Sequence, residues 1–279
     1  MDYRSFANLT GVESIWVIIL VITVVWNAFR FFKNNRHYKA VKNQPLSPIS
    51  TSHAGYIKVS GQVVNENAYA TPFFKEPCCY WEAKVVGHWS ETDHSSDSNT
   101  DTEDHSEVIY NKALDIDYLE VNDGTESILY PINLKIRDMI TDSQTAHAFG
   151  SGSIYSNVIG KSLYKYDYLE VVEKRVLNGE SATAVGQLAF QYDGDSRVLY
   201  VDKAKNRSLP TFLSIQSPAA LHESLRSGVV NRFVYIGVGL FFIFDTFYFD
   251  SRVSSNIIEF IMIVLALILK AFSYFLNLF

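Results

Sequence analysis

Hydrophobic residues gather at the two ends of the chain, whereas the middle alternates between apolar and polar positions. The N-terminal run Ile15–Phe32 is apolar at nearly every position up to Asn27, and the C-terminal end carries the runs Val229–Phe249 and Ile257–Phe279. A helix needs about 20 apolar residues to cross ~30 Å of hydrocarbon. The pattern therefore predicts three α-helical membrane segments, the last two joined by the short polar link Asp250–Asn256.

The middle of the chain reads as short strands separated by turn signals. The turn sequences are Asn122-Asp123-Gly124, Asn178-Gly179 and Asp193-Gly194. Short strands with turn signals every 8–12 residues or so are typical of a sandwich or barrel. We therefore expect a mainly β soluble domain, sandwich or barrel-like. The strand candidates are Tyr56–Val64, Tyr80–Val86, Ile116–Val121, Ser127–Tyr130, Tyr166–Val176, Ala182–Gln191 and Arg197–Val201.

These segments give a predicted domain organisation. Ser217 before Pro218, with leucines at 221 and 225, indicates a short helix over Ser217–Arg226 at the end of the soluble domain. The expected divisions are a short tail (1–14), a transmembrane helix (15–32), a basic linker (33–54), a β-rich domain (55–226), a second transmembrane helix (229–249), a link (250–256) and a third transmembrane helix (257–279).

Basic residues beside the predicted spans indicate the orientation of the chain. Those on the side of the soluble domain are Arg30, Lys33, Arg36, Lys39, Lys42, Arg226 and Arg232, against Arg4 and Arg252 on the other side. Because loops rich in Lys and Arg stay in the cytoplasm, we expect the soluble domain to face the cytoplasm at a bacterial inner membrane. A mitochondrial membrane is the alternative.

Three ionisable residues, Asp245, Glu259 and Lys270, fall inside the predicted C-terminal hairpin. Charges within a membrane are candidates for function. Asp245 and Glu259 lie within roughly 10 Å of the outer interface at ~1.5 Å per residue, which favours headgroup contact. Lys270 lies deeper and could mark the inner end of a short span. A transport or channel component is therefore one alternative function.

The net charge of −6 comes from one acidic segment. Residues Gly87–Glu107 are rich in acids and hold no Lys or Arg, and this composition is typical of a solvated loop at a hairpin tip. His88, His94 and His105 with the nearby carboxylates form a candidate weak site for a divalent metal. The soluble part shows no basic patch with interleaved aromatics, which argues against nucleic-acid binding.

The chain has two cysteines, Cys78 and Cys79, which are adjacent. A disulfide framework and a cysteine-rich zinc module are therefore excluded. The sequence holds no G-x-S-x-G elbow, H-E-x-x-H pair or nucleotide-binding fingerprint. We assign no catalytic residue and expect no cofactor. Cys78 and Cys79 stay as possible reactive thiols, although buried structural thiols are commoner.

Several ordered motifs resemble those of the GIDE domain. They are Gly55–Val64 (GYIKVSGQVV), Pro72–Trp81 (PFFKEPCCYW), Tyr118–Ile136 (YLEVNDGTESILYPINLKI), Tyr168-Leu169-Glu170, Asn178-Gly179, Val185-Gly186 and Phe212–Leu225. The residues that match the family motifs have structural character: glycines suit turns or close strand approach, and aromatics suit the core. These residues are Gly61, Pro77, Tyr80, Trp81, Asp123, Gly124, Pro131, Glu170, Gly179 and Gly186.

The resemblance implies a β-rich interaction domain flanked by membrane helices. The best-known relatives are mitochondrial E3 ubiquitin ligases, in which a RING finger performs the chemistry. Phe279 lies in a hydrophobic run and no cysteines follow to build a RING, so ligase activity is not expected and the likeness is to the RING-less prokaryotic members.

These observations favour a membrane-anchored interaction or scaffold protein. Its expected partners are the lipid bilayer and a protein that binds exposed strand edges or the acidic segment, and a homo-oligomer stays open. The alternative is a membrane-bound enzyme or enzyme subunit that uses the Cys78/Cys79 region or the His-rich loop.

Overall fold

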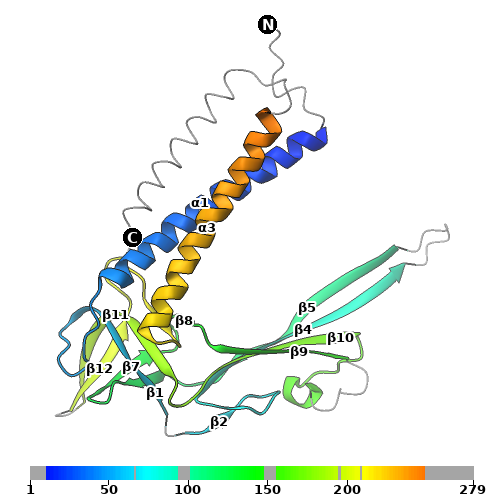
Figure 1. Ribbon diagram of the computed structural model, residues 1–279. Helices are drawn as coiled ribbons and strands as arrows, with labels where there is room; N and C mark the ends of the chain where they lie inside the picture. The colour runs from blue at the N-terminus through cyan, green and yellow to red at the C-terminus, as the bar shows by residue number, and fades with distance from the viewer. Residues whose placement is uncertain are drawn as a thin grey trace. The chain divides into compact units, whose positions relative to one another are not determined.

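The computed structural model describes residues 11–65, 67–93, 101–147, 155–193, 196–207 and 209–248 (Figure 1). The chain divides into a helical unit, Met1–Tyr38 with Ser224–Phe279, and a β unit, Lys39–Glu223. The predicted third membrane segment, with Glu259 and Lys270, lies outside the described residues, as does the side chain of Asp245.

Along the described sequence, one long helix precedes the strands and another follows them. The helices are α1 (Gly11–Asn43) and α3 (Pro218–Tyr248). The strands are β1 (Gly55–Val64), β2 (Tyr69–Ala70), β3 (Pro77–Cys78), β4 (Tyr80–Asp93), β5 (Asp101–Ala113), β6 (Tyr118–Asn122), β7 (Ser127–Pro131), β8 (Ile136–Arg137), β9 (Ile140–His147), β10 (Tyr168–Val176), β11 (Ser181–Asp193), β12 (Ser196–Asp202) and β13 (Phe212–Ser214).

Five strands close into a barrel in the order β1-β6-β7-β12-β11, because β11 pairs back onto β1. All neighbours are antiparallel except β7 and β12, which are parallel. Inward positions alternate along each strand and fill the interior with aliphatic side chains, among them Val59, Leu119, Ile128, Leu188 and Val201. The prediction of a mainly β domain is confirmed, and its architecture is a barrel rather than a sandwich.

A separate antiparallel sheet has the order β5-β4-β10-β9. One of its faces carries a second apolar core, which Phe73 and residues of the segment 155–166 cover. β10 pairs with β4 only as far as His88, so the outer part of β4 pairs with β5 alone. Figure 1 shows this part as a two-stranded ribbon that continues beyond the ends of β9 and β10.

The expectation of a loop over Gly87–Glu107 was wrong for its described parts. Residues 87–93 belong to β4 and residues 101–107 to β5, whereas residues 94–100 lie outside the described residues. A ribbon needs no core to form locally when cross-strand side chains contact each other. Trp89 stacks on His105 with ring centroids 5.2 Å apart, and the Lys165 ammonium lies 3.6 Å from the Trp89 ring centroid.

The helices are longer than their predicted segments. Ser217 caps α3 through a 3.3 Å hydrogen bond from the amide of Ala220, as predicted, and the helix then runs without a break to Tyr248. α1 continues past residue 32 to Asn43, so the first part of the basic linker is helical. Pro45 lies just beyond its end, where proline disfavours a helical residue before it.

Within the helical unit, α1 and α3 pack side by side and antiparallel (Figure 1). The Arg232 guanidinium donates a 2.9 Å hydrogen bond to Asn27 Oδ1, and the Phe31 and Phe233 rings lie 6.1 Å apart. Gly239 lets Val24 approach closely, since a Cβ on Gly239 would lie 2.6 Å from Val24 Cγ2. Of the described residues, one helical segment, Pro218–Ile243, has the length and composition that a membrane crossing requires.

Candidate functional site

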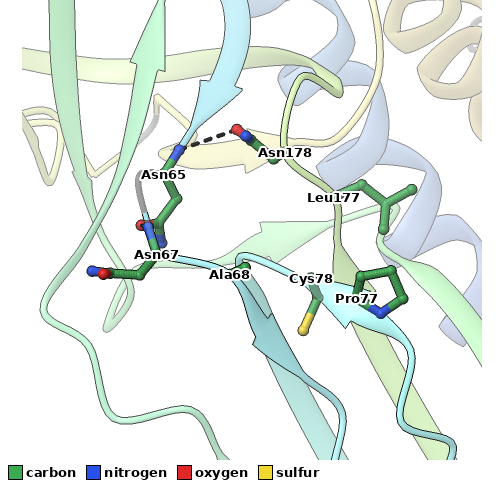
Figure 2. Close-up of a pocket in the computed structure, with 7 residues that line it drawn as sticks. All are labelled: Asn65, Asn67, Ala68, Pro77, Cys78, Leu177 and Asn178. Carbon is green, nitrogen blue, oxygen red and sulfur yellow. Dashed lines mark hydrogen bonds between the residues drawn. The ribbon is translucent and has the colours of Figure 1, made fainter.

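Cys78 lines a pocket that combines a thiol with polar side chains. This pocket has a volume of about 310 Å³. Figure 2 shows Asn65 and Asn178 bridged by a hydrogen bond from the amide of Asn65 to Asn178 Oδ1, 3.1 Å long. The lining residues are Asn65, Asn67, Ala68, Pro77, Cys78, Leu177 and Asn178. None of them is an acid or base that titrates near neutral pH, so the pocket offers amide hydrogen bonding rather than proton transfer.

Cys78 and Cys79 point to different environments, as neighbours on an extended chain do. Both thiols are free and buried. Burial raises the pKa of Cys78, which the Arg175 guanidinium offsets in part. Burial also raises the pKa of Cys79 to about 12, and its Sγ lies 3.1 Å from the Val176 carbonyl oxygen in the barrel core. Because the thiolate is the nucleophile, both thiols are poorly suited to covalent catalysis.

We expect both native thiols to resist alkylation at neutral pH. Iodoacetamide should label the folded chain at least ~100-fold more slowly than the urea-unfolded chain, in which a cysteine has a pKa near 8.5. Mass spectrometry of Cys78→Ala and Cys79→Ala variants assigns the residual rate to the other thiol. An exposed reference thiol, Lys112→Cys in a chain that lacks both native cysteines, should react at the unfolded rate. Rapid native labelling of Cys78 would contradict this description of the pocket.

The predicted metal ligands are not brought together. In the ribbon, Trp89 lies opposite His105 and His88 lies opposite Ser106, so the two histidines are on opposite faces. His88 stacks on Tyr168 with ring centroids 4.5 Å apart. His94 lies outside the described residues. Among the residues that the structure describes, no three His, Cys, Asp or Glu side chains are grouped so that they could hold a metal ion. The pairing of strands thus separates His88 and His105, which composition alone had grouped.

A buried carboxylate that the sequence analysis missed organises the second sheet. Glu173 on β10 is fully buried and accepts hydrogen bonds from the backbone amides of Phe73 at 2.7 Å and Phe74 at 3.1 Å. Leu169 and Val171 have the same parity on β10 and face the same core. Period-two alternation places Glu173 on the inward face, so this signal could have identified it.

The segment that Glu173 holds is a closed loop. The Thr71 amide donates to the Glu76 carbonyl at 2.9 Å, and the Glu76 amide donates to Thr71 Oγ1 at 3.1 Å. Arg175, two residues beyond Glu173 on the same face, forms an ion pair with Asp142 at 2.6 Å and lies 3.8 Å from Glu76. Glu173 and Arg175 of β10 therefore contact the loop of the family-like motif over Pro72–Trp81, and Asp142 of β9 pairs with Arg175.

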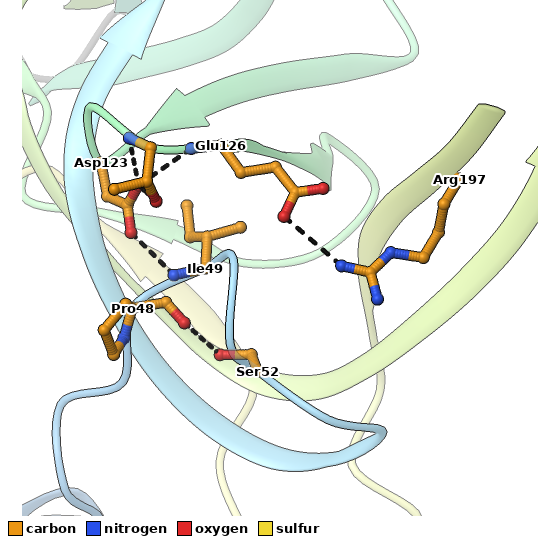
Figure 3. A network of polar contacts seen from close by, with 7 residues as sticks. Pro48, Ile49, Ser52, Asp123, Glu126 and Arg197 are labelled. Atoms are coloured by element: carbon orange, nitrogen blue, oxygen red, sulfur yellow. Dashed lines mark hydrogen bonds and ion pairs between the residues drawn. The ribbon is translucent and has the colours of Figure 1, made fainter.

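Asp123 performs a similar structural role beside the barrel (Figure 3). One carboxylate oxygen accepts the Ile49 amide at 2.7 Å, and the other accepts the amide of Thr125 at 2.9 Å and that of Glu126 at 3.2 Å. Burial alone would raise the pKa of Asp123, but hydrogen bonds from Thr125, Ile49 and Glu126 lower it to about 2. Asp123 thereby ties the segment before β1 to the β6–β7 turn, where Gly124 has a φ of 88°.

The other residues of the family-like motifs lie mainly at close strand contacts, in turns or in the cores. A Cβ on Gly61 would lie 2.3 Å from the Asn122 carbonyl oxygen, and one on Gly186 would lie 2.5 Å from Val201 Cγ1. Gly179 has a φ of 79°, as its turn requires. The remaining positions are Pro77 beside the pocket, Tyr80 in the barrel core, Trp81 against the second core, Pro131 at the end of β7 and Glu170 exposed on β10.

No protein-family model, curated protein or solved structure matches the chain. The resemblance to the GIDE domain therefore stays a prediction from the sequence motifs alone.

Proposed function

We propose that the chain is a membrane-anchored interaction protein that presents its β domain on one side of the bilayer. The outer surface of the α1–α3 pair carries this proposal. Large apolar side chains face outwards along both helices and are about half exposed or more: Ile18, Ile22, Val25, Phe29, Phe32, Val234, Val238 and Phe241. Soluble proteins rarely expose so large an apolar surface to water. Such a surface therefore marks a contact with another protein or with a membrane.

The inside of the pair supports a lipid environment for its outside. Asn27 is buried and Arg232 donates to it across the helix contact, while the Asn27 amide nitrogen donates to the Thr23 carbonyl at 2.8 Å. Polar groups between helices and apolar groups outside them are the arrangement that hydrocarbon favours. α3 and α1 would be two of three membrane segments, and the basic residues near them favour a cytoplasmic position for the β domain.

The β domain offers two open sheet edges for a partner. β5 and β9 are the outer strands of the four-stranded sheet, and an extended peptide can add to such an edge through main-chain hydrogen bonds. The ribbon also carries acidic side chains, of which Glu91 and Glu103 are well exposed. Charges on an edge suppress non-specific strand pairing and select partners of opposite charge, so a protein with a basic, extended segment fits this surface best.

The partner can be captured by crosslinking in cells, gentle-detergent purification of the full chain and mass spectrometry. We expect one specific partner in stoichiometric yield. Recovery should fall at least ~5-fold in the ribbon variant Glu91→Lys/Glu103→Lys, because reversed charges repel a basic segment. The matched variant Asp115→Lys/Asp117→Lys reverses two exposed carboxylates outside the ribbon and should keep full recovery.

The same experiment separates the proposal from its alternatives. Equal recovery with both variants would place the interaction elsewhere on the molecule. A product without any specific partner, but with bound metal or a modified cysteine, would favour an enzyme and contradict the scaffold function.

A further inference from the structure

The outward surface of α1 changes from apolar to basic over a few helical turns. Trp26, Phe29 and Phe32 are exposed there, and Arg30, Lys33 and Arg36 are exposed among and just beyond them. From residue 26 to residue 36 the helix rises ~15 Å. Alternating aromatic and basic side chains are typical of a helix that leaves hydrocarbon and enters the headgroup layer.

The contact between Arg30 and Trp26 indicates where along α1 the headgroup layer begins. The Arg30 guanidinium lies over the Trp26 ring, 4.8 Å from its centroid. A tryptophan ring prefers the membrane interface, and a basic side chain beside it reaches the phosphates there. The cation and the aromatic ring therefore occupy one depth, where the available anions are lipid headgroups.

The chain supplies no carboxylate to neutralise these cations from neighbouring sequence. No Asp or Glu occurs between Ile15 and Asn65, or between Ser224 and Phe244, although the whole chain has a net charge of −6. The positive charge is therefore concentrated at one level of the helical unit.

We propose that Arg30, Lys33 and Arg36 form a binding surface for the headgroups of anionic phospholipids. This inference rests on the membrane anchoring proposed above and adds a lipid preference to it. Each basic residue at an anionic surface strengthens binding by roughly 5-fold. Salt weakens such contacts because it screens exposed charges.

The test measures which lipids remain bound to the full-length protein. The chain is extracted with mild detergent from membranes that contain phosphatidylglycerol and phosphatidylcholine, and the retained lipids are quantified by mass spectrometry. We expect at least ~10-fold enrichment of phosphatidylglycerol over its bulk ratio for the wild type. The variant Arg30→Gln/Lys33→Gln/Arg36→Gln should lose it. The control Lys84→Gln/Lys112→Gln/Lys174→Gln, which removes three exposed cations from the β domain, should keep it.

Each contrary outcome has a defined meaning. Equal enrichment in the α1 variant and the wild type, or equal loss in the control, would overturn the proposed surface. Displacement of the lipid by inorganic phosphate at constant ionic strength would identify free phosphate as the ligand and overturn the lipid assignment. A wild type that resists alkaline carbonate extraction but shows no lipid preference contradicts this inference alone. A chain that carbonate removes from the membrane contradicts the proposed anchoring as well.

Discussion

Replacing Glu173 by glutamine should destabilise the loop between residues 71 and 78 by about 2 kcal/mol, although the two side chains have nearly the same shape. The carboxylate accepts two backbone amides inside the protein. Glutamine offers one oxygen and turns an NH₂ group toward the other donor, so one buried amide loses its acceptor. Hydrogen bonds to charged groups contribute about 1.5–3 kcal/mol each, and a buried unsatisfied donor has a similar cost.

Hydrogen exchange of the full-length protein measures this effect locally. A loss of about 2 kcal/mol corresponds to roughly 30-fold faster exchange of the Phe73 and Phe74 amides, if they exchange through opening of the loop. Glu170→Gln is the matched control, because Glu170 lies on the same strand with its side chain half exposed, and it should change exchange there very little. Unchanged protection in Glu173→Gln would mean that the carboxylate does not hold the loop.

Gly61→Ala should be the most damaging small substitution in the barrel. The added Cβ would lie 2.3 Å from the carbonyl oxygen and 2.6 Å from the carbonyl carbon of Asn122, both of them backbone atoms. The neighbouring Asp123 is anchored by the Ile49 and Thr125 amides, so β6 cannot move away without breaking those hydrogen bonds. Overpacking of a well-packed interior costs about 1–3 kcal/mol, and a backbone obstacle places this site at the upper end.

Thermal unfolding in detergent tests this expectation. A loss of about 3 kcal/mol lowers the Tm by roughly 6–12 °C for a domain of this size. Gly55→Ala gives the comparison within the same strand, because a Cβ there would meet its nearest atom, the His53 carbonyl oxygen, at an ordinary 3.9 Å. Similar Tm values for the two variants would show that β1 and β6 do not approach as closely as described.

The predicted strands of the barrel were found because each buries one face. Buried residues alternate along the strands, as Leu119 and Val121 do on β6 and Ile128 and Tyr130 on β7, and all four belong to one core. The turns with Gly124 and Gly179 have the positive φ that glycine allows. The hydrophobic pattern does not predict which strands pair, because the pairing of β1 with β11 joins segments that are far apart in sequence. The sequence alone therefore could not distinguish a barrel from a sandwich.

The strands that were missed have little or no apolar alternation. Along β9 one position, Ala146, is buried, and the outer ribbon of β4 and β5 is mostly polar on both faces. Cross-strand pairing stabilises both segments, and a single sequence does not display its pairing. Side chains alternate between the two faces of a strand, which separates His88 from His105 and would also have placed Glu173 on the buried face. Part of the candidate site could therefore be predicted once the strands were known.

Closure of the barrel through β1 and β11 has a consequence during synthesis. Gly55 lies opposite Leu188 in the finished structure, and a ribosome that adds roughly 5–20 residues per second needs about 7–27 s to make the chain between them. Throughout that interval the nascent β1 lacks its closing neighbour, so we expect exposure of Ile57, Val59 and Val63, which the finished barrel buries. Premature termination before β11 would leave this edge permanently open, so such fragments should be strong substrates for cellular quality control.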